Sequence, residues 1–296
     1  MNSASKTRGR RLLAHLAVAG FLAVLVAAAA PASGAPQQKA AQTSTTAAAV
    51  ATDQSRKPST KPTLVLVHGA WADGSSWSKV TRRLQNDGFT VRVPPNPLRS
   101  LPGDAATIRD FLSTLSGSIV LVAHSYGGAV ITNAATGNPN VKALVYVDAF
   151  APAEGEIILP LAGADSALAA DPTTVFDFVP YPGAPPGDVD LYLKHTVFLT
   201  SFATGVPRPE AELLYASQRP LTLSSGTQPS GSPAWATIPS WYVLGTQDAI
   251  ITPTAQQFMA ERARARITRV KAGHLSLITQ PQQVTAVIEQ AVRATN

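Results

Sequence analysis

The feature that most constrains this fold is a series of short, continuously apolar segments that alternate with helix-like segments. Most of these segments lack the polar alternation of a half-exposed strand, and they are too short for buried helices. Such runs are typical of strands that are covered on both faces. Their alternation with helices predicts an α/β fold, with a mostly parallel sheet flanked by helices. The expected strands are Thr63–Val67, Thr90–Val93, Ser118–Ala123, Val141–Val147, Ser240–Leu244 and Arg266–Val270.

Helices are expected where apolar residues recur every third or fourth position between these strands. The second of them is expected to be capped near Asp104, which stands at its start. The expected helices are Ser76–Asn86, Asp104–Leu115, Tyr126–Ala135, Pro253–Ala263 and Pro281–Ala294.

Residues 151–239 interrupt the alternation of strands and helices. They are rich in Pro and Gly and contain two short pieces that we interpret as helical, Val189–Phe198 and Pro209–Gln218. Because this segment is inserted between two expected sheet strands, we predict that it forms a cap above the strand ends.

The amino-terminal residues 1–35 have the pattern of an export signal. Basic residues precede the uncharged, apolar run Leu12–Ala30, and small residues follow it. We therefore expect a cleaved signal peptide and a secreted protein. The alternative is a membrane anchor, since an uncleaved apolar run of this length could just span a bilayer.

Residues 36–61 are mainly Ala, Gln, Thr, Ser, Lys and Pro, and are expected to form a flexible linker before a single domain at 62–296.

The formal net charge of +6 does not belong to the expected domain. Residues 1–35 carry +4, residues 36–61 carry +3, and residues 62–296 carry −1. A nearly neutral domain gives no electrostatic indication of a nucleic-acid partner. Once the leader is cleaved, no stable membrane partner is expected either.

The chain contains no Cys, which excludes disulfides, thiolate metal sites and a cysteine nucleophile.

The strongest chemical motif is the segment Ala123-His124-Ser125-Tyr126-Gly127-Gly128. It follows an expected strand and opens an expected helix, as the sharp turn around a nucleophilic serine requires. Neighbours of such a serine must be small. Gly127 meets this need, and Ala123 stands where the motif more often has Gly. An alternative function for Ser125 is simply to cap the helix.

A second motif, His68-Gly69-Ala70-Trp71, follows the first expected strand. A tight turn at this end of a parallel strand can aim backbone N–H groups at a developing oxyanion. We choose the N–H groups of Ala70 and Tyr126 as the two donors. His68 is expected to brace the turn, because no second histidine stands at metal-ligand spacing from it.

Two further polar residues follow expected strands at the same sheet edge. Asp248 lies in Gly245-Thr246-Gln247-Asp248, and His274 lies in Ala272-Gly273-His274-Leu275. The chain order Ser125, Asp248, His274 is one of the known orders of a Ser-His-Asp triad. Asp148, which ends another strand, is an alternative acid.

These motifs together resemble the α/β-hydrolase superfamily over essentially all of residues 62–296. Within it, the chain is similar to the small serine esterase branch, which includes plant methyl esterases, hydroxynitrile lyases and bacterial esterases. The resemblance implies an α/β-hydrolase fold with an inserted cap. It also implies Ser125 as nucleophile, His274 as general base and acid, Asp248 as orienting acid, and Ala70 and Tyr126 as oxyanion donors. The segments that carry it are LVLVHGAWADGSSW, VAHSYGG, ALVYVDAFAP, VLGTQDAIITP and AGHLSLITQP.

The expected function is that of a secreted serine hydrolase, a carboxylesterase for small to medium esters, which needs no metal and no organic cofactor. The alternatives are a lyase or a ligand-binding module on the same fold. Hydroxynitrile lyases of this branch carry Lys two positions after the triad histidine, where this chain has Ser276. A binding module would be expected to lose part of the triad, and all three residues are present.

Overall fold

The computed structural model describes residues 61–295. The predicted export signal and almost all of the predicted linker lie outside the described residues. Six strands form the main sheet in the order β2-β1-β3-β4-β8-β9, and every neighbouring pair is parallel. The predicted α/β architecture, a mostly parallel sheet flanked by helices, is confirmed.

All six predicted sheet strands are present, and their bounds differ from the prediction by at most two residues. The four central strands are almost completely buried, as their continuous apolar runs indicated. The strands are β1 Thr63–Val67, β2 Val91–Arg92, β3 Ile119–His124, β4 Val141–Val147, β8 Ser240–Gly245 and β9 Arg266–Val270.

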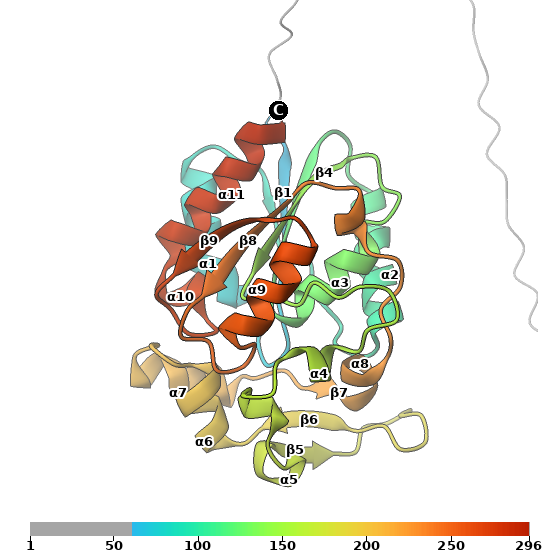
Figure 1. The fold of residues 1–296 in the computed structure, drawn as a ribbon, viewed down its shortest axis with the longest axis vertical. Helices are drawn as coiled ribbons and strands as arrows, with labels where there is room; N and C mark the ends of the chain where they lie inside the picture. The colour runs from blue at the N-terminus through green and yellow to red at the C-terminus, as the bar shows by residue number, and fades with distance from the viewer. Residues whose placement is uncertain (1–60, 296) are drawn as a thin grey trace, which may run out of the picture. The chain divides into compact units, whose positions relative to one another are not determined.

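Helices cover both faces of this sheet (Figure 1). Helices α1 and α11 pack together on one face, and α2, α3 and α9 lie on the other. The bounds are α1 Ser78–Asn86, preceded by the short helix η1 Gly74–Trp77, then α2 Leu101–Ser113, α3 Tyr126–Ala134, α9 Pro253–Arg262, α10 Ser276–Thr279 and α11 Pro281–Thr295. Within the described part of the chain, no helix combines the length and the apolar character needed to cross a membrane.

The prediction that α2 is capped near Asp104 placed the cap too late in the chain, since the N-cap is Ser100. The helix begins three residues earlier, because the side chain of Ser100 accepts the N–H of Gly103 and a proline follows at the start of the helix. Asp104 is instead buried, and its carboxylate accepts hydrogen bonds from the Tyr126 hydroxyl and the Arg99 N–H.

Residues 151–239, which we call the cap segment, connect β4 to β8 and carry a separate antiparallel sheet, β5-β6-β7. This sheet lies below the main sheet in Figure 1. The elements of the cap segment are α4 Ile158–Leu161, η2 Ala167–Ala169, α5 Pro172–Val175, β5 Phe176–Val179, β6 Asp190–Leu193, α6 His195–Val197, η3 Phe198–Phe202, α7 Arg208–Ala216, β7 Leu221–Thr222, α8 Leu223–Thr227 and η4 Ala234–Ala236.

The prediction of a helix over Val189–Phe198 was wrong in its first half. Asp190–Leu193 is a strand, because Leu191 and Leu193 alternate with Tyr192 and pair with β5 on one side, while β7 pairs on the other. The second predicted piece, Pro209–Gln218, corresponds to helix α7.

Candidate active site

Ser125 lies in a sharp turn between the end of β3 and the start of α3. Its φ of 53° is in the left-handed region, which non-glycine residues seldom adopt. The turn is fixed by the Ser125 carbonyl, which accepts the N–H groups of Gly128 at 2.9 Å and Phe150 at 3.1 Å. The serine side chain is therefore presented at the carboxyl end of the sheet instead of capping α3.

The turn needs a residue without a side chain at position 127. A Cβ on Gly127 would lie 2.8 Å from the carbonyl oxygens of both Val67, which ends β1, and His68, which follows it. Neither backbone atom can move without disturbing the main sheet. The close packing of α3 on β1 therefore depends on this glycine.

We expect Gly127→Ala to lower the free energy of unfolding by about 1–3 kcal/mol, the usual cost of forcing an atom into a packed site. Urea denaturation of the full chain measures this difference. An unchanged midpoint and slope would contradict the close approach of α3 and β1 described here.

A continuous chain of hydrogen bonds joins the three residues that the sequence predicted as a triad. The distance from His274 Nε2 to Ser125 Oγ is 2.8 Å, and the distance from His274 Nδ1 to Asp248 Oδ2 is also 2.8 Å. The exposed fractions are 2% for Ser125, 4% for Asp248 and 0% for His274. The Nδ1–H donates to the carboxylate, which leaves Nε2 free to accept the serine proton.

The carboxylate of Asp248 has three further donors. Its Oδ1 accepts the backbone N–H groups of Ile250 at 2.7 Å and Ile251 at 3.0 Å. Its Oδ2 accepts Nε2–H of Gln256, on α9, at 2.8 Å. Sequence reasoning missed Gln256, although a polar residue on the inward face of the helix after Asp248 was a usable signal.

Asp148, the alternative acid, follows β4 but makes no hydrogen bond to the imidazole of His274, whose ring nitrogens bond to Asp248 and Ser125. Its Oδ2 accepts the N–H of Ser276 at 3.2 Å, and its Oδ1 has no partner among the described residues. Burial, together with the neighbouring charge of Asp248, raises the pKa of Asp148 well above its usual range. Burial therefore disfavours the charged form of Asp148, and its hydrogen bond to Ser276 holds the loop after His274.

Two backbone N–H groups flank the Ser125 turn. Ala70 lies in the turn after β1, and Tyr126 is the first residue of α3, where helix N–H groups have no partner within the helix. Among the described residues, neither N–H donates to a backbone or side-chain acceptor. Both N–H groups thus keep a hydrogen-bonding capacity that the described residues do not use.

The two other buried histidines near the site have bracing hydrogen bonds. His68 Nδ1–H donates to Gly69 O at 2.9 Å, while its Nε2 accepts the Asn96 N–H at 3.0 Å. His124 Nε2–H donates to the carbonyl oxygen of His274 at 2.8 Å. His68 thus supports the turn before Ala70, and His124 supports the loop that carries His274.

Burial opposes charge on both partners of the His274–Asp248 pair. It lowers the pKa of His274 to about 3 and raises the pKa of Asp248. The two backbone N–H groups and Gln256 counteract this effect on the carboxylate. Burial also lowers the pKa of the adjacent His124, whose ring centroid lies 4.8 Å from that of His274. The site can therefore hold a neutral imidazole ready to accept a proton.

Across residues 61–295, no three His, Asp or Glu side chains are grouped so that they could hold a metal ion.

Comparisons with known proteins give a consistent result. Residues 64–287 match the model of the alpha/beta hydrolase family. A carbendazim hydrolyzing esterase from a Nocardioides species is 36% identical over 110 residues, which make up 33% of this chain and 46% of that relative. The chain thus matches less than half the length of this curated relative.

Solved structures share the fold along nearly their whole length. An extracellular alpha/beta-hydrolase from a Paenibacillus species has a TM-score of 0.62 and 21% identity, covering 78% of this chain and 98% of that one. A methylesterase protein from Arabidopsis has a TM-score of 0.63 and 17% identity, covering 79% of this chain and 99% of that one. At these sequence identities, the structural similarity shows the fold alone.

Proposed function

The chain belongs to the alpha/beta hydrolase family, and from this premise we propose that it is a serine hydrolase that cleaves carboxylic esters. The family is the one that the sequence motifs predicted. The observation that carries the proposal is the hydrogen-bonded chain Ser125–His274–Asp248, with both distances at 2.8 Å. Fold alone would not distinguish a hydrolase from a lyase or a binding protein.

The proposed reaction is a two-step acyl transfer. His274 Nε2 takes the proton of Ser125 as Oγ attacks the ester carbonyl, and Asp248 stabilises the resulting imidazolium. The N–H groups of Ala70 and Tyr126 stabilise the tetrahedral oxyanion. His274 then gives its proton to the departing alcohol. Water, activated in the same way, releases the acid from the acyl-enzyme.

The proposed substrates are small to medium carboxylic esters. The name of the Nocardioides relative, an esterase, supports an ester as the substrate. The test is a series of p-nitrophenyl esters of increasing acyl length with the purified full chain. We expect hydrolysis of the short esters, and an absence of turnover across the whole series would overturn the proposal.

We also propose that the protein acts outside the cytoplasm. The support is the sequence of residues 1–35, in which basic residues precede an apolar run followed by small residues. Amino-terminal sequencing of protein recovered from the culture medium tests this. The expected mature chain begins near residue 35, and recovery of the intact chain in the cell fraction would contradict it.

The pH dependence of kcat/KM should follow the neutral form of His274. The base is active only when unprotonated, and burial lowers its pKa to about 3 from an ordinary 6.5. A lowered pKa keeps the imidazole neutral as the pH falls, so activity should persist below pH 6.5 and decline only in more acidic buffer. A pH–rate profile with its acidic inflection at or above 6.5 would contradict this expectation.

A further inference from the structure

Trp71, next to the proposed oxyanion donor Ala70, has a strained backbone. Its φ is 55°, in the left-handed region that bulky side chains avoid. A strained conformation persists only where surrounding contacts hold it in place. Because Trp71 directly follows Ala70, contacts that hold Trp71 in place also restrain the turn that carries the Ala70 N–H.

The contacts that hold Trp71 come from the cap segment. Its backbone N–H donates to Arg219 O at 2.9 Å, and its indole Nε1–H donates to Leu191 O at 2.8 Å. Its ring packs against Phe176 and Phe202, with centroid distances of 6.0 and 5.8 Å. Hydrogen bonds and aromatic contacts from the cap segment therefore hold the turn that carries Ala70 in place.

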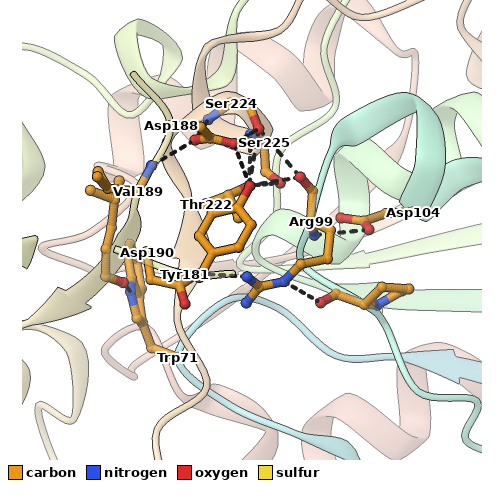
Figure 2. Close-up of polar contacts among 12 residues, drawn as sticks. Trp71, Arg99, Asp104, Tyr181, Asp188, Val189, Asp190, Thr222, Ser224 and Ser225 are labelled. Atoms are coloured by element: carbon orange, nitrogen blue, oxygen red, sulfur yellow. Dashed lines mark hydrogen bonds and ion pairs between the residues drawn. The ribbon is translucent and has the colours of Figure 1, made fainter. Parts of the chain in front are cut away.

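The residue that carries the second donor is also linked to the cap segment. The Tyr126 hydroxyl donates to Asp104 Oδ2 at 2.7 Å, and the Arg99 N–H donates to Asp104 Oδ1 at 3.1 Å. The Arg99 guanidinium then donates to Asp190 Oδ1 at 2.8 Å and lies 4.9 Å from the ring centroid of Tyr181 (Figure 2).

Both links end on the same strand of the cap sheet. Asp190 and Leu191 are the first two residues of β6, and Figure 2 shows Arg99 and Trp71 approaching this part of the cap segment. The hydroxyl of Thr222, on the neighbouring β7, donates to Arg99 O at 2.9 Å and reinforces the contact. One strand is thus linked to the residues of both proposed oxyanion donors, through Trp71 in one case and through Arg99 and Asp104 in the other.

We propose that strand β6 of the cap segment positions the oxyanion donors, with Trp71 and Arg99 as positioning residues. The inference rests on the proposed function, because it concerns the same reaction. Oxyanion stabilisation depends on donors that are already aimed at the developing charge. A small displacement of either N–H should therefore slow the chemical step and leave ground-state binding of the ester unchanged.

The variant Trp71→Phe tests this role. It removes the indole N–H and keeps an aromatic ring against Phe176 and Phe202. We expect kcat for p-nitrophenyl acetate to fall about 10- to 100-fold with KM unchanged within about twofold. The matched control is Trp235→Phe, which also loses one indole hydrogen bond, to Pro152 O at 2.9 Å, outside the oxyanion turn. The control should keep wild-type kcat.

An alkylboronic acid separates a positioning role from a general loss of packing. Ser125 Oγ adds to boron, its proton passes to His274, and the resulting anionic tetrahedral boronate places a boron-bound hydroxyl oxygen at the oxyanion position. The inhibition constant should rise in Trp71→Phe by about the same factor as kcat falls, because both report oxyanion binding.

The outcomes are distinguishable. A kcat for Trp71→Phe equal to that of Trp235→Phe, or a fall in kcat without weaker boronate binding, overturns the positioning role alone. Equal activity of wild type and Ser125→Ala overturns the proposed function and this inference with it. If Trp71→Phe does not fold, Asp190→Asn decides the matter. This variant keeps the shape of the Asp190 side chain and weakens its bond to the Arg99 guanidinium. A kcat equal to that of the wild type would overturn the proposed role of β6.

Discussion

Replacing Ser125 with alanine is expected to lower kcat for p-nitrophenyl acetate by at least about 10⁵-fold, with little change in stability. Loss of the nucleophile removes the acyl-enzyme route, and only the weak catalysis of the remaining site persists. The Ser125 Oγ makes one side-chain hydrogen bond, to His274, so its removal should not disturb the fold. Steady-state kinetics and thermal unfolding of the full chain measure both quantities.

Ser240→Ala provides a matched control for this change. Ser240 is also a buried serine, but it begins β8, at the opposite end of the sheet from Ser125, and its hydroxyl donates to Ile238 O at 3.1 Å. Its variant should retain wild-type kcat. If Ser125→Ala were as active as Ser240→Ala, Ser125 would not be the nucleophile.

The second large effect is expected for Asp248→Asn, a loss of about 10⁴-fold in kcat, as in serine proteases. The Ile250 and Ile251 N–H groups would hold the amide oxygen at the Oδ1 position, so the amide NH₂ would face His274. This NH₂ donates to Nδ1 and forces the proton onto Nε2. The imidazole then cannot accept the proton of Ser125.

The corresponding change at Asp148 tests the choice between the two acids. Asp148 accepts the Ser276 backbone N–H and makes no hydrogen bond to the imidazole, so Asp148→Asn should reduce kcat by less than about tenfold. The comparison uses the same ester and the same pH for both variants. Full activity of Asp248→Asn with a large loss in Asp148→Asn would reverse the assignment of the acid.

The main sheet was predictable because its strands are read from local composition. A run such as Leu64–Val67 is apolar at every position, as expected for a strand that is covered on both faces of the sheet. The meeting of Ser125, Asp248 and His274 followed from a second rule, since parallel strands end at a common edge. Each of these residues follows a different strand of that sheet.

The cap segment was less predictable because its structure depends on distant partners. The run Asp190–Leu193 is short enough to fit a helix or a strand, and its pairing with Phe176–Val179 and Leu221–Thr222 decided the outcome. The burial of Asp104 likewise depends on Tyr126, which lies on another helix. No local pattern indicates that Trp71 donates to Leu191, which is 120 positions away in the chain.

The most direct test of the central claim, that Ser125 is the nucleophile of an ester hydrolase, is mass spectrometry of the full chain after treatment with an alkyl p-nitrophenyl phosphonate. Ser125 Oγ should displace p-nitrophenolate from phosphorus and form a stable adduct. We predict one label per chain, on the peptide containing Ser125, with ester hydrolysis lost in proportion to labelling. Loss of hydrolysis with the label on another residue, or full hydrolysis by a chain labelled at Ser125, would contradict the account.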